Sequence, residues 1–365
     1  MNLAGARVLG SNSSVKRSKI LQHHLCDRIA MPSFRHRAQA LSESEKSQIK
    51  PDFSFGIVAD IQYADIPDGH SYHGTPRFYR NAKAALRRAV SMLREGSIPL
   101  SFTIQLGDIV DGNCKENAEK ALDGILGELN AFGKPVYHML GNHCLYNLDR
   151  ELLHQKMEIP NLPADGGSYY SFEPHPSWRF VVLDSYDVSL PGWEPSHPRY
   201  QLALEWLKKN NPNENKNNPQ GLEGVERRWV AFGGGASPEQ VAWFKQQLQE
   251  ASAKKQRVMV FSHLPFQPGT APNPCLQWNY EELLDVMRGS SCVVATFAGH
   301  AHQNGYVRDE WGIHHLVLPS VLETPPGRDC YGHIKVYGDK VKLVGTDCMM
   351  SLDMSLGRKV LQEAA

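Results

Sequence analysis

The stretch Phe53-Ser54-Phe55-Gly56-Ile57-Val58-Ala59 ends directly on Asp60-Ile61-Gln62, so polar side chains follow an apolar run at once. An apolar run of this length is typical of a buried strand. The arrangement recurs in four later segments that contain carboxylate, amide or imidazole groups: Gly107-Asp108-Ile109-Val110-Asp111-Gly112, Gly141-Asn142-His143, Ser262-His263 and Gly299-His300-Ala301-His302. Because ligands gather beyond the carboxyl ends of strands in open α/β sheets, we expect the five segments to meet.

The rest of the chain alternates strand-like with helix-like patterns. Helical periodicity predicts helices over residues 76–95 and 115–132, and apolar runs predict strands over 101–106 and 135–140. This alternation predicts a largely parallel sheet. The second half is richer in strand-like runs, at 179–184, 257–261, 292–298, 314–318, 333–337 and 341–345. We therefore expect an α/β fold in which a second sheet packs on the first, with helices outside both.

The chain divides by composition into three parts. Residues 1–50 begin with a basic, serine-bearing stretch whose first acidic residue is Asp27, which fits either a disordered tail or an organellar targeting segment. Residues 51–350 form the predicted catalytic domain, and 351–365 a C-terminal tail. An insertion at 188–238 interrupts the domain, and its Asn-rich part, 210–220, is predicted to be a mobile loop because it has few apolar side chains to bury. The insertion could be a lid that sets substrate size or a surface excursion.

Charge and cysteine content exclude several classes of protein. Lys plus Arg equals Asp plus Glu at 39 each, so net charge indicates neither nucleic acid nor a membrane as partner. The 7 cysteines include no Cys-x-x-Cys pair, which argues against a thiolate zinc site and for a reducing compartment. We expect a cytoplasmic monomer that acts on a small molecule, with plastid or mitochondrial targeting as the alternative for the location.

The five segments supply the groups that a two-metal hydrolase needs. Two divalent ions about 3.5–4 Å apart share a ligand, and a carboxylate can bridge them. Asp108 is the natural bridge. Asp60 offers an oxygen to the first ion and Asn142 an oxygen to the second. Imidazoles complete the two shells, from His263, His300 and His302.

In this order the five segments resemble the calcineurin-like metallophosphoesterase superfamily over residues 53–346. The resemblance implies a four-layer α/β/β/α sandwich with two mixed sheets, and a His143 side chain paired with Asp111 beside the metals. It implies that the first metal is held by Asp60, Gln62, Asp108 and His302. The second would be held by Asp108, Asn142, His263 and His300.

Two positions depart from the common pattern of the superfamily. Most members have Asp-x-His where this chain has Asp60-Ile61-Gln62, and an amide oxygen favours Mn²⁺ or Mg²⁺ over zinc. The Asp-x-Gln variant is similar to the manganese-dependent ADP-ribose/CDP-alcohol diphosphatases. The resemblance implies hydrolysis of ADP-ribose and CDP-alcohols (CDP-choline, CDP-ethanolamine, CDP-glycerol) with Mn²⁺, although Mg²⁺, Zn²⁺ and iron remain alternatives. Cys144 replaces the usual acidic residue after Gly-Asn-His, and we expect it to change packing or metal tuning only.

Catalysis and substrate binding involve further residues. His143, oriented by Asp111, is the candidate catalytic acid that protonates the departing group. Candidates for substrate contact are Tyr63, Asn142, Trp278 and Tyr280, although packing in the core is an equal reading for the last two. The alternative functions are a cyclic-nucleotide phosphodiesterase, a broad phosphomonoesterase, or a metal-free scaffold of the same fold.

Overall fold

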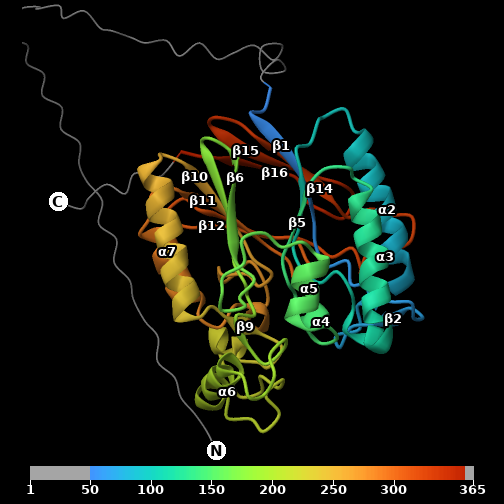
Figure 1. The fold of residues 1–365 in the computed structure, drawn as a ribbon, viewed down its shortest axis with the longest axis vertical. Helices are drawn as coiled ribbons and strands as arrows, with labels where there is room; N and C mark the ends of the chain where they lie inside the picture. The colour runs from blue at the N-terminus through green and yellow to red at the C-terminus, as the bar shows by residue number, and fades with distance from the viewer. Residues whose placement is uncertain (1–49, 358–365) are drawn as a thin grey trace, which may run out of the picture. The chain divides into compact units, whose positions relative to one another are not determined.

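The structure is a computed structural model that describes residues 50–357 (Figure 1). The predicted N-terminal tail or targeting segment, and residues 358–365, lie outside the described residues. Two six-stranded sheets form the centre of the fold. The first has the order β16-β15-β14-β1-β4-β5, with bounds Leu352–Ser355, Lys340–Gly345, Gly332–Val336, Phe53–Val58, Thr103–Gln105 and Val136–His138. The second has the order β12-β13-β11-β10-β7-β6, with bounds Gly305–Arg308, His314–Val317, Val293–Ala298, Arg257–Phe261, Trp178–Val182 and Tyr170–His175.

Both sheets are mixed, as the resemblance implies. In the first sheet β1, β4 and β5 run parallel, while β14 pairs antiparallel with β1. In the second sheet β7, β10, β11 and β13 run parallel, and β6 and β12 are antiparallel edge strands. The parallel strands of each sheet therefore end at a common edge, and those edges carry the polar segments.

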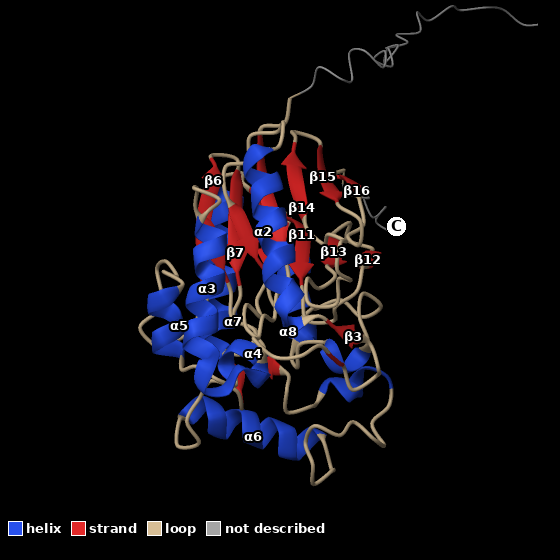
Figure 2. Cartoon of the chain, turned by 90° about the vertical axis from the view of Figure 1, so that its right-hand side faces the viewer, coloured by secondary structure: helices blue, strands red, loops and turns tan. Residues whose placement is uncertain are grey.

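Helices cover the outer faces of the two sheets (Figures 1 and 2). On the first sheet lie α2 (Tyr79–Glu95) and α3 (Ala118–Asn130), and on the second lie α7 (Pro238–Ala253) and α8 (Tyr280–Arg288). In α2 the buried residues recur at helical spacing, as Ala82, Ala85, Leu86, Ala89, Val90 and Leu93. The four-layer α/β/β/α prediction is confirmed.

Side-chain alternation explains why the second sheet is buried on both faces. In β10, Met259 and Phe261 point into the core between the sheets, while Val258 and Val260 pack under α7 and α8. A strand covered on both sides reads as a continuous apolar run, which is how this one appears in the sequence. Between the sheets the rings of Phe55 and Phe180 lie 5.2 Å apart.

Short elements connect these layers and surround the polar edge. They are β2 (Gly69–His70), β3 (Pro76–Arg77), η1 (Gly112–Asn117), α4 (Asn142–Leu145), α5 (Arg150–Lys156), β8 (Val188–Ser189), α6 (Pro198–Asn210), η2 (Gly224–Arg228), β9 (Gly234–Gly235) and η3 (Asn273–Cys275). Among the described residues, no helix has both the length and the apolar character needed to cross a membrane.

Two predicted boundaries are wrong. The helix predicted from residue 76 begins at Tyr79, because Pro76–Arg77 pairs with β2 in a small hairpin. The C-terminal tail predicted from residue 351 contains β16, which hydrogen-bonds to β15 and extends the first sheet. Local propensity did not reveal either pairing, since both depend on a partner strand elsewhere in the fold.

The insertion has a small core of its own. Val188, Trp229 and the α6 residues Ala203 and Leu207 are buried together with Trp278, which comes from outside the insertion. The prediction of a mobile loop at 210–220 overlooked Asn211, whose fully buried amide donates hydrogen bonds to the carbonyls of Lys216, Asn218 and Trp229. Hydrogen bonds from one amide thus organise a loop that has little apolar surface to bury.

A buried cation anchors the insertion to the domain. The guanidinium of Arg150 lies 2.7 Å from the Asp184 carboxylate and 4.1 Å from the Trp193 ring, and its side chain is 6% exposed. Arg150→Met would leave Asp184 buried without its cation, so we expect the free energy of unfolding to fall by about 3–5 kcal/mol. Urea denaturation followed by circular dichroism measures this. Arg87→Met, which removes an exposed cation paired with Glu128, is the control, and an equal shift in both variants would contradict the anchoring role.

Candidate metal centre

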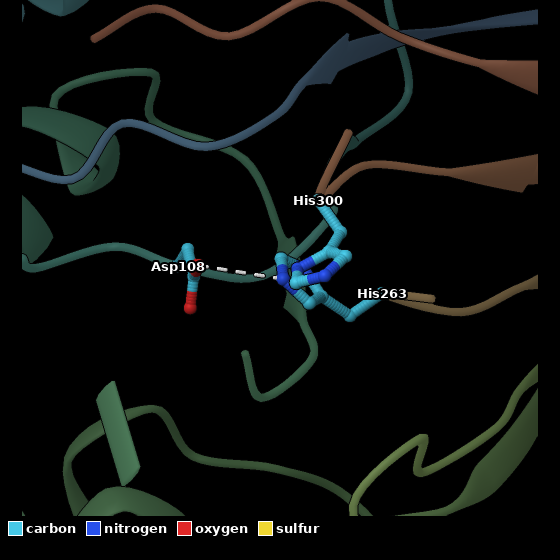
Figure 3. Close-up of side chains that lie close together, drawn as sticks. All are labelled: Asp108, His263 and His300. Carbon is cyan, nitrogen blue, oxygen red and sulfur yellow. Dashed lines mark ion pairs between the residues drawn. The ribbon is translucent and has the colours of Figure 1, made fainter. Parts of the chain in front are cut away.

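The five polar segments meet at the carboxyl edge of the two sheets. The segments after β1 and β4 are joined by a hydrogen bond from the Asp60 amide to the Gly107 carbonyl, and those after β10 and β11 by one from Gly299 to His263. Asp108, His263 and His300 offer ligand atoms that all lie within 4.8 Å of one another (Figure 3). Residues that are up to about two hundred positions apart in sequence therefore face one small volume.

Asp60, Gln62 and His302 form a second group of side chains beside Asp108. Nε2 of Gln62 is 2.9 Å from Oδ2 of Asp108 and 3.1 Å from Nε2 of His302. Nε2 of His302 is in turn 3.4 Å from Oδ1 of Asp60. Asp108 thus contacts Gln62 of this group as well as His263 of the first, as a carboxylate shared by two ions would.

The hydrogen bonds of His263 show which of its nitrogens faces the centre. Nδ1 lies 2.7 Å from the Leu106 carbonyl, which can only accept, so Nδ1 carries the proton. In the neutral ring Nε2 is then bare; it is buried without a hydrogen-bond partner and lies 3.4 Å from the Asp108 carboxylate. Burial opposes a charge on this ring, but the nearby Asp108 carboxylate raises the pKa of His263. The position between Nε2 and that carboxylate therefore favours a cation, and a metal ion can take the place of the proton there.

Burial also keeps His300 in the form that binds metals. Burial, followed by the neighbouring His263, holds the pKa of His300 well below its usual range. The rings of His263 and His300 lie 5.1 Å apart, and both are close to Asp108 (Figure 3). A neutral imidazole presents a free lone pair to a cation, whereas an imidazolium does not.

Asn142 is held by two tyrosines. Its Oδ1 accepts a hydrogen bond from the buried hydroxyl of Tyr186 at 2.9 Å, and its Nδ2 donates to the hydroxyl of Tyr146 at 3.1 Å. The next residue, His143, donates its backbone N–H to Oδ1 of Asp108 at 2.8 Å. These contacts fix the orientation of the Asn142 amide beside the Asp108 carboxylate.

His143 and Asp111 are paired as the resemblance implies. Nδ1 of His143 lies 3.0 Å from Oδ2 of Asp111 and also 3.0 Å from the backbone nitrogen of Gly112. When protonated, Nδ1 can donate to Asp111, and when bare it can accept from Gly112. Nδ1 therefore has a neighbour in either tautomer, and Nε2 is the nitrogen left for proton transfer.

The backbone around the centre is strained. Five of the seven predicted ligands have positive φ angles: Asp60 (48°), Gln62 (43°), Asp108 (54°), His300 (65°) and His302 (55°). Non-glycine residues in this region cost free energy and persist where the surrounding structure enforces them, commonly at functional sites. Glycines allow the close packing: a Cβ atom on Gly141 would collide with the Asp108 carboxylate, and one on Gly299 with that of Asp60.

The residues predicted to contact substrate differ in how far they are buried. Trp278 is fully buried in the core of the insertion, where its indole N–H donates to the Val230 carbonyl, so it offers no surface to a substrate. Tyr280 is 7% exposed and packs at the start of α8 beneath Arg228. For these two residues the structure favours core packing, the alternative given for them, and their contact with substrate stays a prediction. Tyr63 is partly exposed and lies 5.7 Å from Lys83, so it remains a candidate.

Sequence reasoning missed residues that touch the centre. Tyr186 follows the end of β7, so a sixth strand end provided a signal for it. Phe232, whose ring lies 5.9 Å from that of His300, comes from the insertion, where no motif marks it.

Cys144 is fully buried, its sulfur accepts a hydrogen bond from the Ile109 amide, and burial raises the pKa of its thiol to about 12. A neutral, packed thiol agrees with the modest role expected for it.

The donor set fits two divalent cations. Carboxylate, amide and imidazole groups are the ligands of Mn²⁺ and related metals, and the described residues around the centre include no thiolate ligand. Besides Nε2 of His263, Oε1 of Gln62 is buried without a hydrogen-bond partner. A half-turn of the Gln62 amide would bring this oxygen to the side of Asp108 and His302.

These features define a metal-dependent phosphoesterase centre, and comparison with known proteins agrees. The family model described as calcineurin-like phosphoesterase matches residues 53–304, and the chain belongs to that family. A protein of Oryza sativa named manganese-dependent ADP-ribose/CDP-alcohol diphosphatase is 47% identical over 310 residues, which cover 84% of this chain and 95% of that protein.

Less similar relatives support the same family assignment. A Homo sapiens protein of the same name is 38% identical over 322 residues, covering 84% of this chain and 92% of that protein. The crystal structure of a dimetal phosphatase from Danio rerio superimposes with a TM-score of 0.81 at 36% identity, covering 84% of this chain and 100% of that one. Each of these three matches covers 84% of this chain and more than nine-tenths of the relative.

Proposed function

We propose that this metal-dependent phosphohydrolase cleaves the diphosphate bond of ADP-ribose and of CDP-alcohols, with Mn²⁺ as its cofactor. The products are AMP or CMP and the phosphorylated partner. The observation that carries the proposal is the amide of Gln62, which lies between Asp108 and His302 where most of the superfamily has an imidazole. Relatives that are 38–47% identical over most of their length, and are named for this activity, support it.

Each ligand has a place in the proposed centre. The first ion would be held by Asp60, Gln62, Asp108 and His302, and the second by Asp108, Asn142, His263 and His300. When bound, two such ions acidify water and offset the charge that develops on the phosphoryl oxygens. The residues of the chain hold this constellation before substrate arrives, because backbone and second-layer hydrogen bonds fix Asp60, His263 and Asn142.

His143 supplies the proton for the departing group. Its side chain is 19% exposed at the edge of the centre, and no hydrogen bond occupies its Nε2 among the described residues. The Asp111 carboxylate on Nδ1 stabilises the imidazolium and aims Nε2 outward. A phosphate leaving group needs little protonation, whereas an alkoxide needs much more, so the contribution of His143 depends on the substrate.

Gln62→His should change the metal preference. An imidazole suits Zn²⁺ better than an amide oxygen does, whereas oxygen ligands suit Mn²⁺. We expect the ratio of Zn²⁺ to Mn²⁺ affinity to rise on the order of tenfold relative to the wild type. Competition binding of the two metals to metal-free protein measures this ratio, and an unchanged ratio would show that Gln62 does not face the first ion.

Metal-free protein reconstituted with single metals tests the proposed activity. The protein is stripped with a chelator and supplied with Mn²⁺, Mg²⁺, Zn²⁺ or no metal. Products of ADP-ribose are then separated by ion-exchange chromatography. We expect AMP in a 1:1 ratio with the phosphorylated sugar, fastest with Mn²⁺. Inertness under all four conditions would favour the metal-free scaffold instead.

A further inference from the structure

Glu323 lies directly behind His302, on a loop that follows β13. This loop returns to the carboxyl end of β1 in the first sheet, where the amides of Val321 and Leu322 donate to the carbonyls of Ala59 and Asp60. The Glu323 backbone amide donates to Oγ of Ser320, and its side chain is 15% exposed. The carboxylate is therefore held by a loop that is itself hydrogen-bonded to the strand carrying the Asp60 ligand.

The contact between Glu323 and His302 decides which nitrogen of the imidazole is protonated. Oε1 of Glu323 lies 2.9 Å from Nδ1 of His302. An ionised carboxylate only accepts hydrogen bonds, so Nδ1 must carry a proton. In the neutral ring Nε2 is then bare, and it is the nitrogen that lies 3.4 Å from Asp60 and 3.1 Å from Gln62. Glu323 touches the far side of the ring, so it is not itself a candidate ligand.

Arg77 supplies the countercharge for Glu323. Its Nε lies 3.6 Å from Oε1 of Glu323, and its side chain is 19% exposed. Arg77 ends β3, and the next residue, Phe78, donates its backbone N–H to the carbonyl of Leu322 in the Glu323 loop. The hairpin and the loop are thus joined by one backbone bond and one ion pair, both beside the metal centre.

We propose that Glu323, supported by Arg77, is a positioning residue that fixes the tautomer and orientation of His302 for a divalent cation. The proposal rests on the metal centre of the proposed function and assigns residues that no motif in the sequence marks. Partners of this kind on the second nitrogen of a metal-binding histidine typically change metal affinity by about 10–100-fold. Glu323 should therefore act on one of the two metal sites, the one that contains His302.

Binding of Mn²⁺ to full-length, metal-free protein tests this directly. The wild type, Glu323→Ala, Glu323→Gln and Arg77→Met are titrated with Mn²⁺, and free Mn²⁺ is measured by electron paramagnetic resonance. We expect Glu323→Ala to weaken one site by about 10–100-fold and to leave the other unchanged. Glu323→Gln should lose less, because its amide oxygen can accept the same hydrogen bond. Arg77→Met should weaken the same site, by a smaller factor than Glu323→Ala.

The controls separate positioning from general damage. Glu310→Ala removes an exposed carboxylate in the turn between β12 and β13 and should bind both ions like the wild type. Thermal melting of each metal-free variant checks folding, and Glu323→Gln serves as the test if Glu323→Ala does not fold. Wild-type affinity at both sites in folded Glu323 variants would overturn this inference alone. A wild-type protein that binds no Mn²⁺ would overturn the metal centre and this inference with it.

Discussion

Asp108→Ala is expected to lower kcat/KM for ADP-ribose by about 10³-fold or more, because it removes the one carboxylate that both ions would share. Asp108 lies 2.9 Å from Gln62, 3.4 Å from His263 and 2.8 Å from the backbone of His143, so its loss disturbs both groups of ligands. Steady-state kinetics with Mn²⁺, together with the Mn²⁺ stoichiometry of the variant, measure the effect.

Two further variants sharpen the test of Asp108. Asp108→Asn keeps the shape of the side chain and removes its charge, so it should retain the fold and lose most of the activity. Asp339→Ala removes an exposed carboxylate near the far end of the first sheet and should leave kcat/KM unchanged. Full activity of a folded Asp108→Ala protein would refute the bridging role.

His143→Ala is expected to have the second largest effect, and its size should depend on the leaving group. For an alkyl phosphodiester we expect kcat to fall by about 10²–10⁴-fold, the usual contribution of a general acid. For ADP-ribose the loss should be smaller, because a departing phosphate is already stable as an anion. Parallel kinetics on the two substrates give the ratio of losses.

Asp111→Asn probes the same step through the orientation of His143. It preserves a hydrogen-bond acceptor near Nδ1 but removes the negative charge that stabilises the imidazolium, so it should reproduce part of the His143→Ala loss with the same substrate dependence. Equal losses on the two substrates for His143→Ala would argue against its assignment as the acid.

The layers and the meeting of the five segments could be predicted because each depends on local patterns. The β10 run from Arg257 to Phe261 is apolar on both faces, which indicates a covered strand, and parallel strands place their following residues at one edge. The ends of helices and strands were harder to predict from the sequence. The hairpin that shortens α2 and the strand β16 in the predicted tail both exist because of hydrogen bonds to segments elsewhere in the fold.

The finer features of the site depend on tertiary structure. The sequence Asp60-Ile61-Gln62 does not reveal that Asp60 and Gln62 adopt left-handed backbone conformations, because non-glycine residues rarely adopt them without support from the surrounding structure. Glu323 is one of many carboxylates in the sequence, and only the return of its loop to β1 brings it to His302. Trp278 stands between two ligand-bearing segments in the sequence, yet its side chain packs in the small core beside α6.

The most direct test of the central claim is the substrate preference of the Mn²⁺-loaded protein. Values of kcat/KM are measured for ADP-ribose, CDP-choline, cyclic AMP and p-nitrophenyl phosphate, and the products are identified by chromatography. The proposed function predicts that both diphosphate conjugates are preferred over the other two substrates, with AMP and CMP as products. A preference for the cyclic nucleotide or the monoester would contradict it.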